Sequence, residues 1–134
     1  MAKKQLGDVV YDDVTGEICM RTLGDITPKR VKIDANSAAA AGNELVAAVS
    51  GKKICVLGIC LIAAEAVNVT FYSDAADTGT AISGAMPLSE SGGFVLPAPV
   101  HSELHWFETV AGESLTMLLN AAVQCSGWLV YYEE

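Results

Sequence analysis

Residues 52–65 read KKICVLGICLIAAE, a nearly continuous run of apolar and partly β-branched side chains with charged residues at both ends. An apolar run of this length predicts a β-strand with both faces covered. Gly58 lies in its middle and indicates a bulge or a bend. The run falls well short of the ~20 residues of a membrane-spanning helix, so we expect no membrane partner.

The segments on either side of this run also have the pattern of strands. The sequence AVNVTFYS at residues 66–73 alternates, which places Val67, Val69 and Phe71 on one face, and VKID at residues 31–34 alternates as well. About eight short strands, residues 43–50 and 105–109 among them, are separated by turn residues at ~8–12-residue spacing and indicate a sandwich or a barrel. No stretch has the period of a long helix, which excludes alternating βαβ folds. We predict an all-β protein with an antiparallel, jelly-roll-like β-sandwich.

The chain divides into a sandwich domain, residues 31–134, and an N-terminal segment, residues 1–30. The N-terminal segment contains Gly7, Gly16, Gly24 and Pro28 and has little periodicity, and short extended pieces are expected at residues 8–11 and 17–21. Two interpretations are open: a disordered tail, and an ordered arm that lies on a partner. Its apolar side chains are too many for a free tail and favour an extended arm.

The charges are few and unevenly distributed. All eight lysines and arginines lie at or before Lys53, the net charge is -8, and hydrophobic residues make up 51% of the chain against 18% charged residues. An acidic body without a basic stripe would repel a phosphate backbone, so no nucleic-acid partner is expected. So much apolar surface with so little charge predicts a surface that a partner covers.

The four cysteines are Cys19, Cys55, Cys60 and Cys125, and they show no CxxC spacing. The first residues, MAKKQLGD, lack the apolar region of a signal peptide, so we expect free thiols made in a reducing host cytoplasm. In a regular strand, Cys55 and Cys60 would point to opposite faces because an odd number separates them. They are therefore expected to act as small buried hydrophobic residues and not as a disulfide.

Several motifs together resemble a module of small virion proteins from tailed bacteriophages and prophages. They are SGKKI (50–54), VNVTFYS (67–73), GTAISGAMPL (79–88), GGFVLP (92–97), WFET (106–109) and GESL (112–115). The family that the chain resembles is the head-decoration, or capsid cement, β-sandwich proteins. The similarity covers about residues 50–132 and leaves out the N-terminal segment.

The resemblance implies a structural protein that binds the outer capsid surface of the virion as a homotrimer and stabilises the shell. Its partners would be the major capsid protein and two further copies of the chain. A second interpretation is a tail-fibre or receptor-binding β-domain that contacts host surface glycans. The residues expected to bind the capsid lie in the arm and are Leu6, Val9, Tyr11, Ile18, Met20 and Arg21. The residues expected at the oligomer interface are His101, His105, Trp106 and Tyr132.

Few residues have the pattern of a chemical site. His101, Glu103 and His105 alternate, so on a strand they would share one face and could form a zinc set. Two ordinary histidines in a polar loop, or histidines stacked about a threefold axis as a pH-sensitive contact, are the other interpretations. No GxSxG motif or phosphate loop occurs, and the paired acids are adjacent in sequence. We therefore expect neither enzyme activity nor a cofactor or metal.

Overall fold

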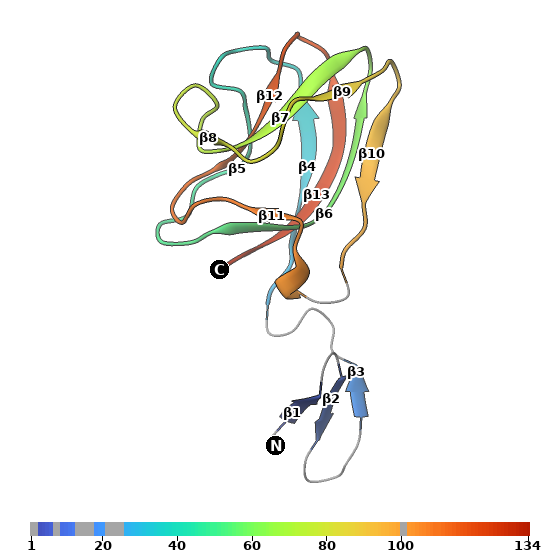
Figure 1. Ribbon diagram of the computed structural model, residues 1–134, viewed down its shortest axis with the longest axis vertical. Helices are drawn as coiled ribbons and strands as arrows, with labels where there is room; N and C mark the ends of the chain where they lie inside the picture. Colours follow the sequence, from blue (N-terminus) through green and yellow to red (C-terminus); the bar gives the residue numbers. More distant parts are fainter. Residues whose placement is uncertain (1–2, 7–8, 13–17, 21–25, 100–101) are drawn as a thin grey trace.

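Two antiparallel β-sheets pack face to face in the computed structural model, which describes residues 3–6, 9–12, 18–20, 26–99 and 102–134 (Figure 1). Sheet I comprises β4 (Lys29–Ala35), β6 (Ile54–Ala63), β10 (Gly93–Leu96), β11 (Phe107–Glu108) and β13 (Cys125–Glu133). Its strand order is β10-β6-β13-β4, with β11 paired to β6 as well. The predicted β-sandwich is confirmed, and the jelly-roll topology stays a prediction.

Sheet II covers the inner face of sheet I. It comprises β5 (Asn43–Val46), β7 (Val67–Ser73), β8 (Thr80–Ala81), β9 (Met86–Leu88) and β12 (Leu115–Leu119). The strand order is β5-β12-β7-β8, with β9 paired to β7. The one helical element in the described residues is a single 3-10 turn, η1 (Ser102–Leu104). No helix in the described part of the chain has the length and apolarity to cross a bilayer.

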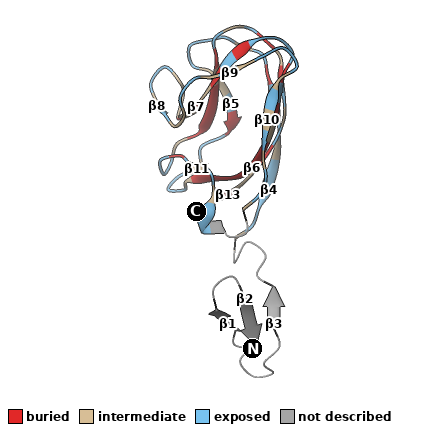
Figure 2. Cartoon of the chain, turned by 45° about the vertical axis from the view of Figure 1, so that its right-hand side comes forward, coloured by how far each residue is buried: buried red, intermediate tan, exposed pale blue. Residues whose placement is uncertain are grey.

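The core lies between the two sheets (Figure 2). Sheet II contributes Val69, Phe71 and Met117, which are almost fully buried, and sheet I contributes Ile59 and Leu61. Each such side chain contributes roughly 1.5–3 kcal/mol to folding through its burial. The predicted common face of Val67, Val69 and Phe71 is confirmed, because all three lie in this core.

A bulge in β6 determines which of its side chains face outward. Gly58 lies opposite Val130 of β13, whereas Val56 lies opposite Tyr131, so Leu57 has no partner in that ladder. The extra residue reverses the alternation of the strand. As a result, Val56 and then Ile59 and Leu61 face the core, a spacing that a regular strand would not allow.

The bulge corrects one prediction and confirms another. Gly58 does mark a bulge, as its place in the apolar run indicated. The expectation that Cys55 and Cys60 face opposite sides is wrong, because the unpaired Leu57 lies between them. Both cysteines lie on the outer face of sheet I, and Cys55, Cys60 and Cys125 are free thiols.

Other predicted strands are present but shorter. The strand expected from Asn43 ends at Val46, and the strand expected over residues 105–109 is reduced to the two residues of β11. The expectation that His101, Glu103 and His105 share one face of a strand is not met, because Ser102–Leu104 form a 3-10 turn. His101 itself lies outside the described residues.

The backbone of the N-terminal segment contains three short paired strands. These are β1 (Lys3–Leu6), β2 (Val9–Asp12) and β3 (Ile18–Met20), in the antiparallel order β1-β2-β3. The strands β2 and β3 correspond to the two extended pieces that the sequence indicated. The first strand of the sandwich, β4, begins at Lys29, two residues before the predicted boundary.

Candidate functional site

One end of sheet I carries a row of three functional side chains on its outer face. In the β11–β6 ladder Glu108 lies directly opposite Cys55, and in the β6–β13 ladder Tyr132 lies directly opposite the same cysteine. Residues directly opposite each other in antiparallel strands point to the same side of the sheet. The pairing therefore brings together a carboxylate, a thiol and a phenol from three separate parts of the chain.

His105 contacts two of these three side chains. It lies between η1 and β11, and its two ring nitrogens meet two members of the row. Nε2 is 3.0 Å from Glu108 Oε2, and Nδ1 is 3.3 Å from the Tyr132 hydroxyl. The His105 and Tyr132 rings meet edge to face with centroids 6.0 Å apart. Cys55 Sγ lies 3.9 Å from Glu108 Oε2, the same oxygen that His105 meets.

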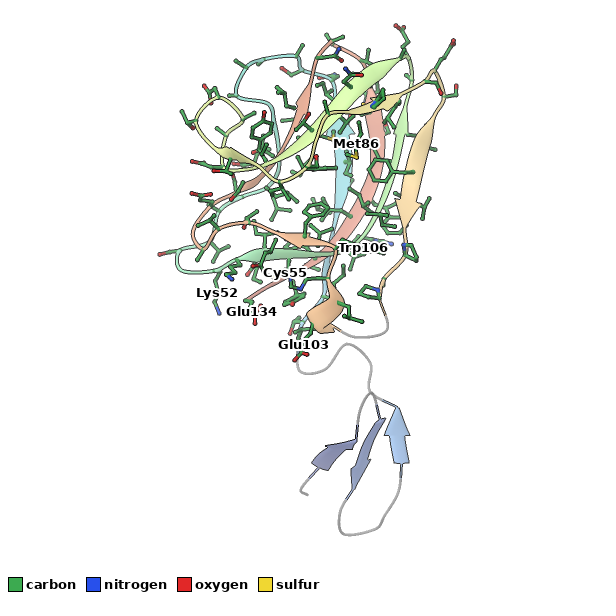
Figure 3. The ribbon with its side chains drawn as sticks, in the orientation of Figure 1. Lys52, Cys55, Met86, Glu103, Trp106 and Glu134 are labelled. Atoms are coloured by element: carbon green, nitrogen blue, oxygen red, sulfur yellow. The ribbon has the colours of Figure 1, made fainter. Side chains whose placement is uncertain are left out.

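A second row of charges borders the first. Lys53 and Glu134 exchange two backbone hydrogen bonds of 2.8 and 3.0 Å, which place them beside Cys55 and Tyr132. Glu134 Oε2 is 3.8 Å from Cys55 Sγ, and Lys53 Nζ is 3.1 Å from Glu108 Oε1 (Figure 3 shows Cys55 and Glu134 together). We refer to Cys55, His105, Glu108, Tyr132 and Glu134 as the Cys55 cluster.

Burial and neighbouring charges shift the ionisation of this cluster. Cys55 is fully buried beside two carboxylates, and mainly through its desolvation the pKa of the thiol rises from 9.0 to about 11. Burial also raises the pKa of Tyr132. The hydrogen bond from Lys53 lowers the pKa of Glu108, so this carboxylate is ionised at neutral pH. A thiol with a raised pKa is a poor nucleophile, so the cluster does not resemble a Cys–His catalytic pair.

The cluster is also a potential metal site. The ligand atoms of Cys55, His105 and Glu108 all lie within 4.8 Å of one another. The sequence pointed to a different set, in which His105 was joined to His101 and Glu103. Glu103 is instead exposed on η1 (Figure 3). Sequence reasoning missed Cys55 and Glu108 because only the β11–β6 pairing brings them together.

The predicted interface residues are partly assembled here. His105 and Tyr132 are in contact, and Tyr132 is only 4% exposed, so it offers little surface to a neighbour. Trp106 is 47% exposed, and its indole nitrogen donates a hydrogen bond of 3.0 Å to the Pro97 carbonyl oxygen. For the capsid-binding set, Leu6, Val9, Tyr11, Ile18 and Met20 lie on β1, β2 and β3, of which the structure describes the backbone. Arg21 and His101 lie outside the described residues.

A second feature of sheet I is an exposed apolar patch on the same outer face. Val95 and Trp128 flank Cys60 in one row across β10, β6 and β13, and Ile62 lies two residues further along β6. Val95 is 63% exposed, Ile62 53% and Trp128 41%. These four residues, Val95, Cys60, Ile62 and Trp128, are called the outer-face patch. Because the bulge turns Cys60 and Ile62 outward, a regular alternation of the sequence of β6 could not have identified this patch.

A shallow open groove of about 530 Å³ lies on the other side of Glu108, between β7, β8 and the turn after β11. Ser73 lines this groove, and its hydroxyl makes two hydrogen bonds within the fold. It donates to Glu113 Oε2 at 2.5 Å and accepts from the Val110 amide at 2.9 Å. Among the described residues that line the groove there is no histidine to activate a serine held in this way.

Comparisons of this chain with protein-family models, with curated proteins and with solved structures found no match.

Proposed function

We propose that this protein is a capsid decoration protein of a tailed bacteriophage, which binds the outer surface of the head as a homotrimer and reinforces the shell. The observation that supports this proposal most directly is the outer-face patch. The resemblance of residues 50–132 to decoration proteins gives the class of partner. The proposed role is mechanical and involves no catalysis.

The outer-face patch has the features of a surface that another protein covers. Three large apolar side chains gather on one sheet face, where a solitary soluble domain carries polar groups on the solvent side of an antiparallel sheet. Opposite charges border the patch on β4, where Lys32 Nζ and Asp34 Oδ2 are 3.7 Å apart. An apolar centre with a polar rim is the usual composition of a protein interface. We assign the patch to contacts between copies of the chain.

The arm is proposed to bind the capsid. Arms of this kind add strands or apolar anchors to the surface of a partner. A protein that binds across the boundaries of assembled capsid subunits, and not to free subunits, stabilises the assembled state by mass action. Attachment by the arm and trimer formation by the patch are then separate properties, which separate variants can remove.

Trimer formation is tested with the double variant Ile62→Glu/Val95→Glu. Both side chains are exposed in the single chain, so the substitutions leave the fold intact but place charges in the proposed interface. We expect a trimer for the wild type and a monomer for the variant by analytical ultracentrifugation. Val110→Glu, at an equally exposed valine in the turn after β11, is the control and should remain trimeric. A monomeric wild type would refute the proposed assembly.

Capsid binding is tested by removing residues 1–25. The cut spares Ile26, which packs against Cys55, Leu57 and Tyr132, and it spares β4. We expect the truncated protein to form trimers but not to sediment with purified phage heads, whereas the full chain does both. Heads that bind the truncated and full chains equally would refute the role of the arm.

A tail-fibre or receptor-binding domain is the second candidate, and two exposed tryptophans favour it. Trp106 and Trp128 are 47% and 41% exposed, and protein sites for sugars commonly stack an aromatic ring on the sugar. In that case Trp106→Ala and Trp128→Ala would abolish binding to host surface glycans, and the protein would be present in few copies per virion. Many copies on the head surface would support decoration instead.

A further inference from the structure

The Cys55 cluster combines three kinds of ligand that zinc prefers, at one end of a rigid sheet. Cysteine sulfur, histidine nitrogen and carboxylate oxygen are the usual zinc ligands in proteins. Two of them, Cys55 and Glu108, are fixed opposite each other by the β11–β6 ladder. The third, His105, lies two residues before β11 and points back to the same carboxylate oxygen. We propose that Cys55, His105 and Glu108 bind one zinc ion, with a water molecule as the fourth ligand.

Two of the three distances between the ligand atoms are close to those of a tetrahedral site. Zinc bonds of about 2.0–2.3 Å at tetrahedral angles place neighbouring ligand atoms roughly 3.4–3.6 Å apart. In the protein, His105 Nε2 is 3.0 Å from Glu108 Oε2, and Cys55 Sγ is 3.9 Å from the same oxygen. The third pair, Cys55 Sγ and the His105 ring nitrogen, lies within 4.8 Å, so side-chain rotations that move the ligand atoms by up to about an ångström would bring all three around one ion.

The side chains around the three ligands would help to orient them toward a zinc ion. Histidine ligands usually donate their second ring N–H to a nearby acceptor, which fixes the ring. Here the Tyr132 hydroxyl lies 3.3 Å from His105 Nδ1, so Nε2, which meets Glu108 Oε2 at 3.0 Å, is the nitrogen that would turn to the metal. Lys53 contacts Oε1 of Glu108, so the ion pair can persist while Oε2 binds zinc. Glu134, 3.8 Å from the sulfur, adds the negative charge that a cation favours.

The burial of the cysteine separates this site from an accidental surface cluster. Cys55 is fully buried and Tyr132 nearly so, while the His105 side chain is 17% exposed and that of Glu108 39% exposed. The sulfur thus lies at the base of the site, and the imidazole and carboxylate form its edge. A metal ion can enter over this edge without opening the sheet. Once bound, it would fasten the segment before β11 to β6.

The experiment uses the purified full-length protein after removal of metal with a chelator. We expect one zinc ion per chain by titration calorimetry and by elemental analysis after dialysis. Cobalt provides a spectroscopic probe of the same site. Binding should produce a sulfur-to-cobalt charge-transfer band and the intense visible bands of tetrahedral cobalt, both of which zinc then removes.

Three variants test the proposed ligands, and a fourth tests the residue that orients His105. Cys55→Ser should remove the charge-transfer band, and His105→Gln and Glu108→Gln should each weaken zinc binding by more than about tenfold. Tyr132→Phe, which removes only the oxygen that orients His105, should weaken it by about 10–100-fold. Cys60→Ser is the matched control, since Cys60 is a free thiol further along the same strand and should bind like the wild type.

Either of two results would overturn the proposed zinc site. A wild-type protein that takes up no zinc at micromolar concentration, or a charge-transfer band that survives in Cys55→Ser, would refute it. Circular dichroism shows whether Cys55→Ser is folded. If it is not, the decision rests on His105→Gln, whose side chain lies at the edge of the site, and unchanged zinc affinity in that folded variant would refute the site. The result is independent of whether the protein decorates capsids.

Discussion

Gly127 of β13 approaches Cys60 of β6 so closely that a Cβ atom on the glycine would lie 1.8 Å from the Cys60 carbonyl oxygen. Gly127 also has a positive φ of 157°. It lies in the middle of sheet I, opposite Leu61 on one side and Ile33 on the other. The central pair of strands therefore depends on the absence of a side chain at this one position.

Gly127→Ala should destabilise the protein severely. The added methyl group must push β13 away from β6 within the ladder that joins these two central strands. We therefore expect the free energy of unfolding to fall by about 3 kcal/mol or more. Urea denaturation followed by circular dichroism measures this loss. Gly84→Ala is the control, because nothing lies within 4 Å of its Cβ position, and it should change the stability by less than about 0.5 kcal/mol. Equal effects of the two substitutions would contradict the packing described above.

Thr109 supplies a buried hydrogen bond that secures the start of β6. Its hydroxyl oxygen accepts from the Ile54 amide at 3.0 Å, and the residue is 2% exposed. Thr109→Val keeps the shape but leaves that buried amide without this acceptor, so the free energy of unfolding should fall by about 1–3 kcal/mol. Thr109→Ser keeps the hydroxyl and should lose clearly less. The same denaturation experiment compares the two variants, and a valine variant as stable as the serine variant would contradict the role of this bond.

The three cysteines of the sandwich should differ in reactivity toward thiol reagents. Cys60 is half-buried on the outer face, whereas Cys55 and Cys125 are fully buried and burial raises the pKa of both thiols. Reaction requires an accessible thiolate. Brief alkylation of the native, metal-free variant Ile62→Glu/Val95→Glu, in which no second copy covers the outer-face patch, should therefore label Cys60 first, as read out by peptide mass spectrometry. After denaturation all three should react, which serves as the control. Labelling of Cys125 as fast as Cys60 in the native protein would be inconsistent with the structure.

Cys125 should make the stability fall at alkaline pH. Burial raises its pKa above the ordinary 9.0, so the folded protein retains a proton that the unfolded chain releases. Its contribution is fully present below pH 9 and is lost as the pH rises further. The difference in stability between the wild type and Cys125→Ala should therefore shrink above pH 9. Urea denaturation at several pH values measures it, and a constant difference would indicate a normal thiol pKa in the folded state.

Much of the fold could be predicted from local patterns. The alternation of Val67, Val69 and Phe71, the apolar run of β6 and the glycine at its bulge each depend on residues that are close in sequence, and each is present as predicted. Predicted strand lengths were less accurate, because pairing partners and not composition determine where a strand ends. β11 is short because it meets β6 at only two positions, between the bulge and the end of the ladder.

The site could not be predicted in the same way. His105 was identified as a candidate, but its partners were sought at neighbouring positions, in His101 and Glu103. The structure provides Glu108, three residues away, and Cys55 and Tyr132, which are distant in sequence. Such partners depend on strand register, which is a long-range property, and the motif SGKKI or WFET contains no information about which strand lies beside it.

By itself, the sequence determined that the chain forms short strands, which face of β7 is apolar, and that the body is acidic. Side-chain polarity with a period of two is a local property, so it can be read without knowing which strands pair. Only the tertiary structure decided which side chains of β6 face outward. The single unpaired residue Leu57 reverses the alternation, and the ladders on either side of β6 then bring Glu108 and Tyr132 to Cys55. The pairing of strands distant in sequence is settled by the packing of the whole sandwich, and no local pattern records it.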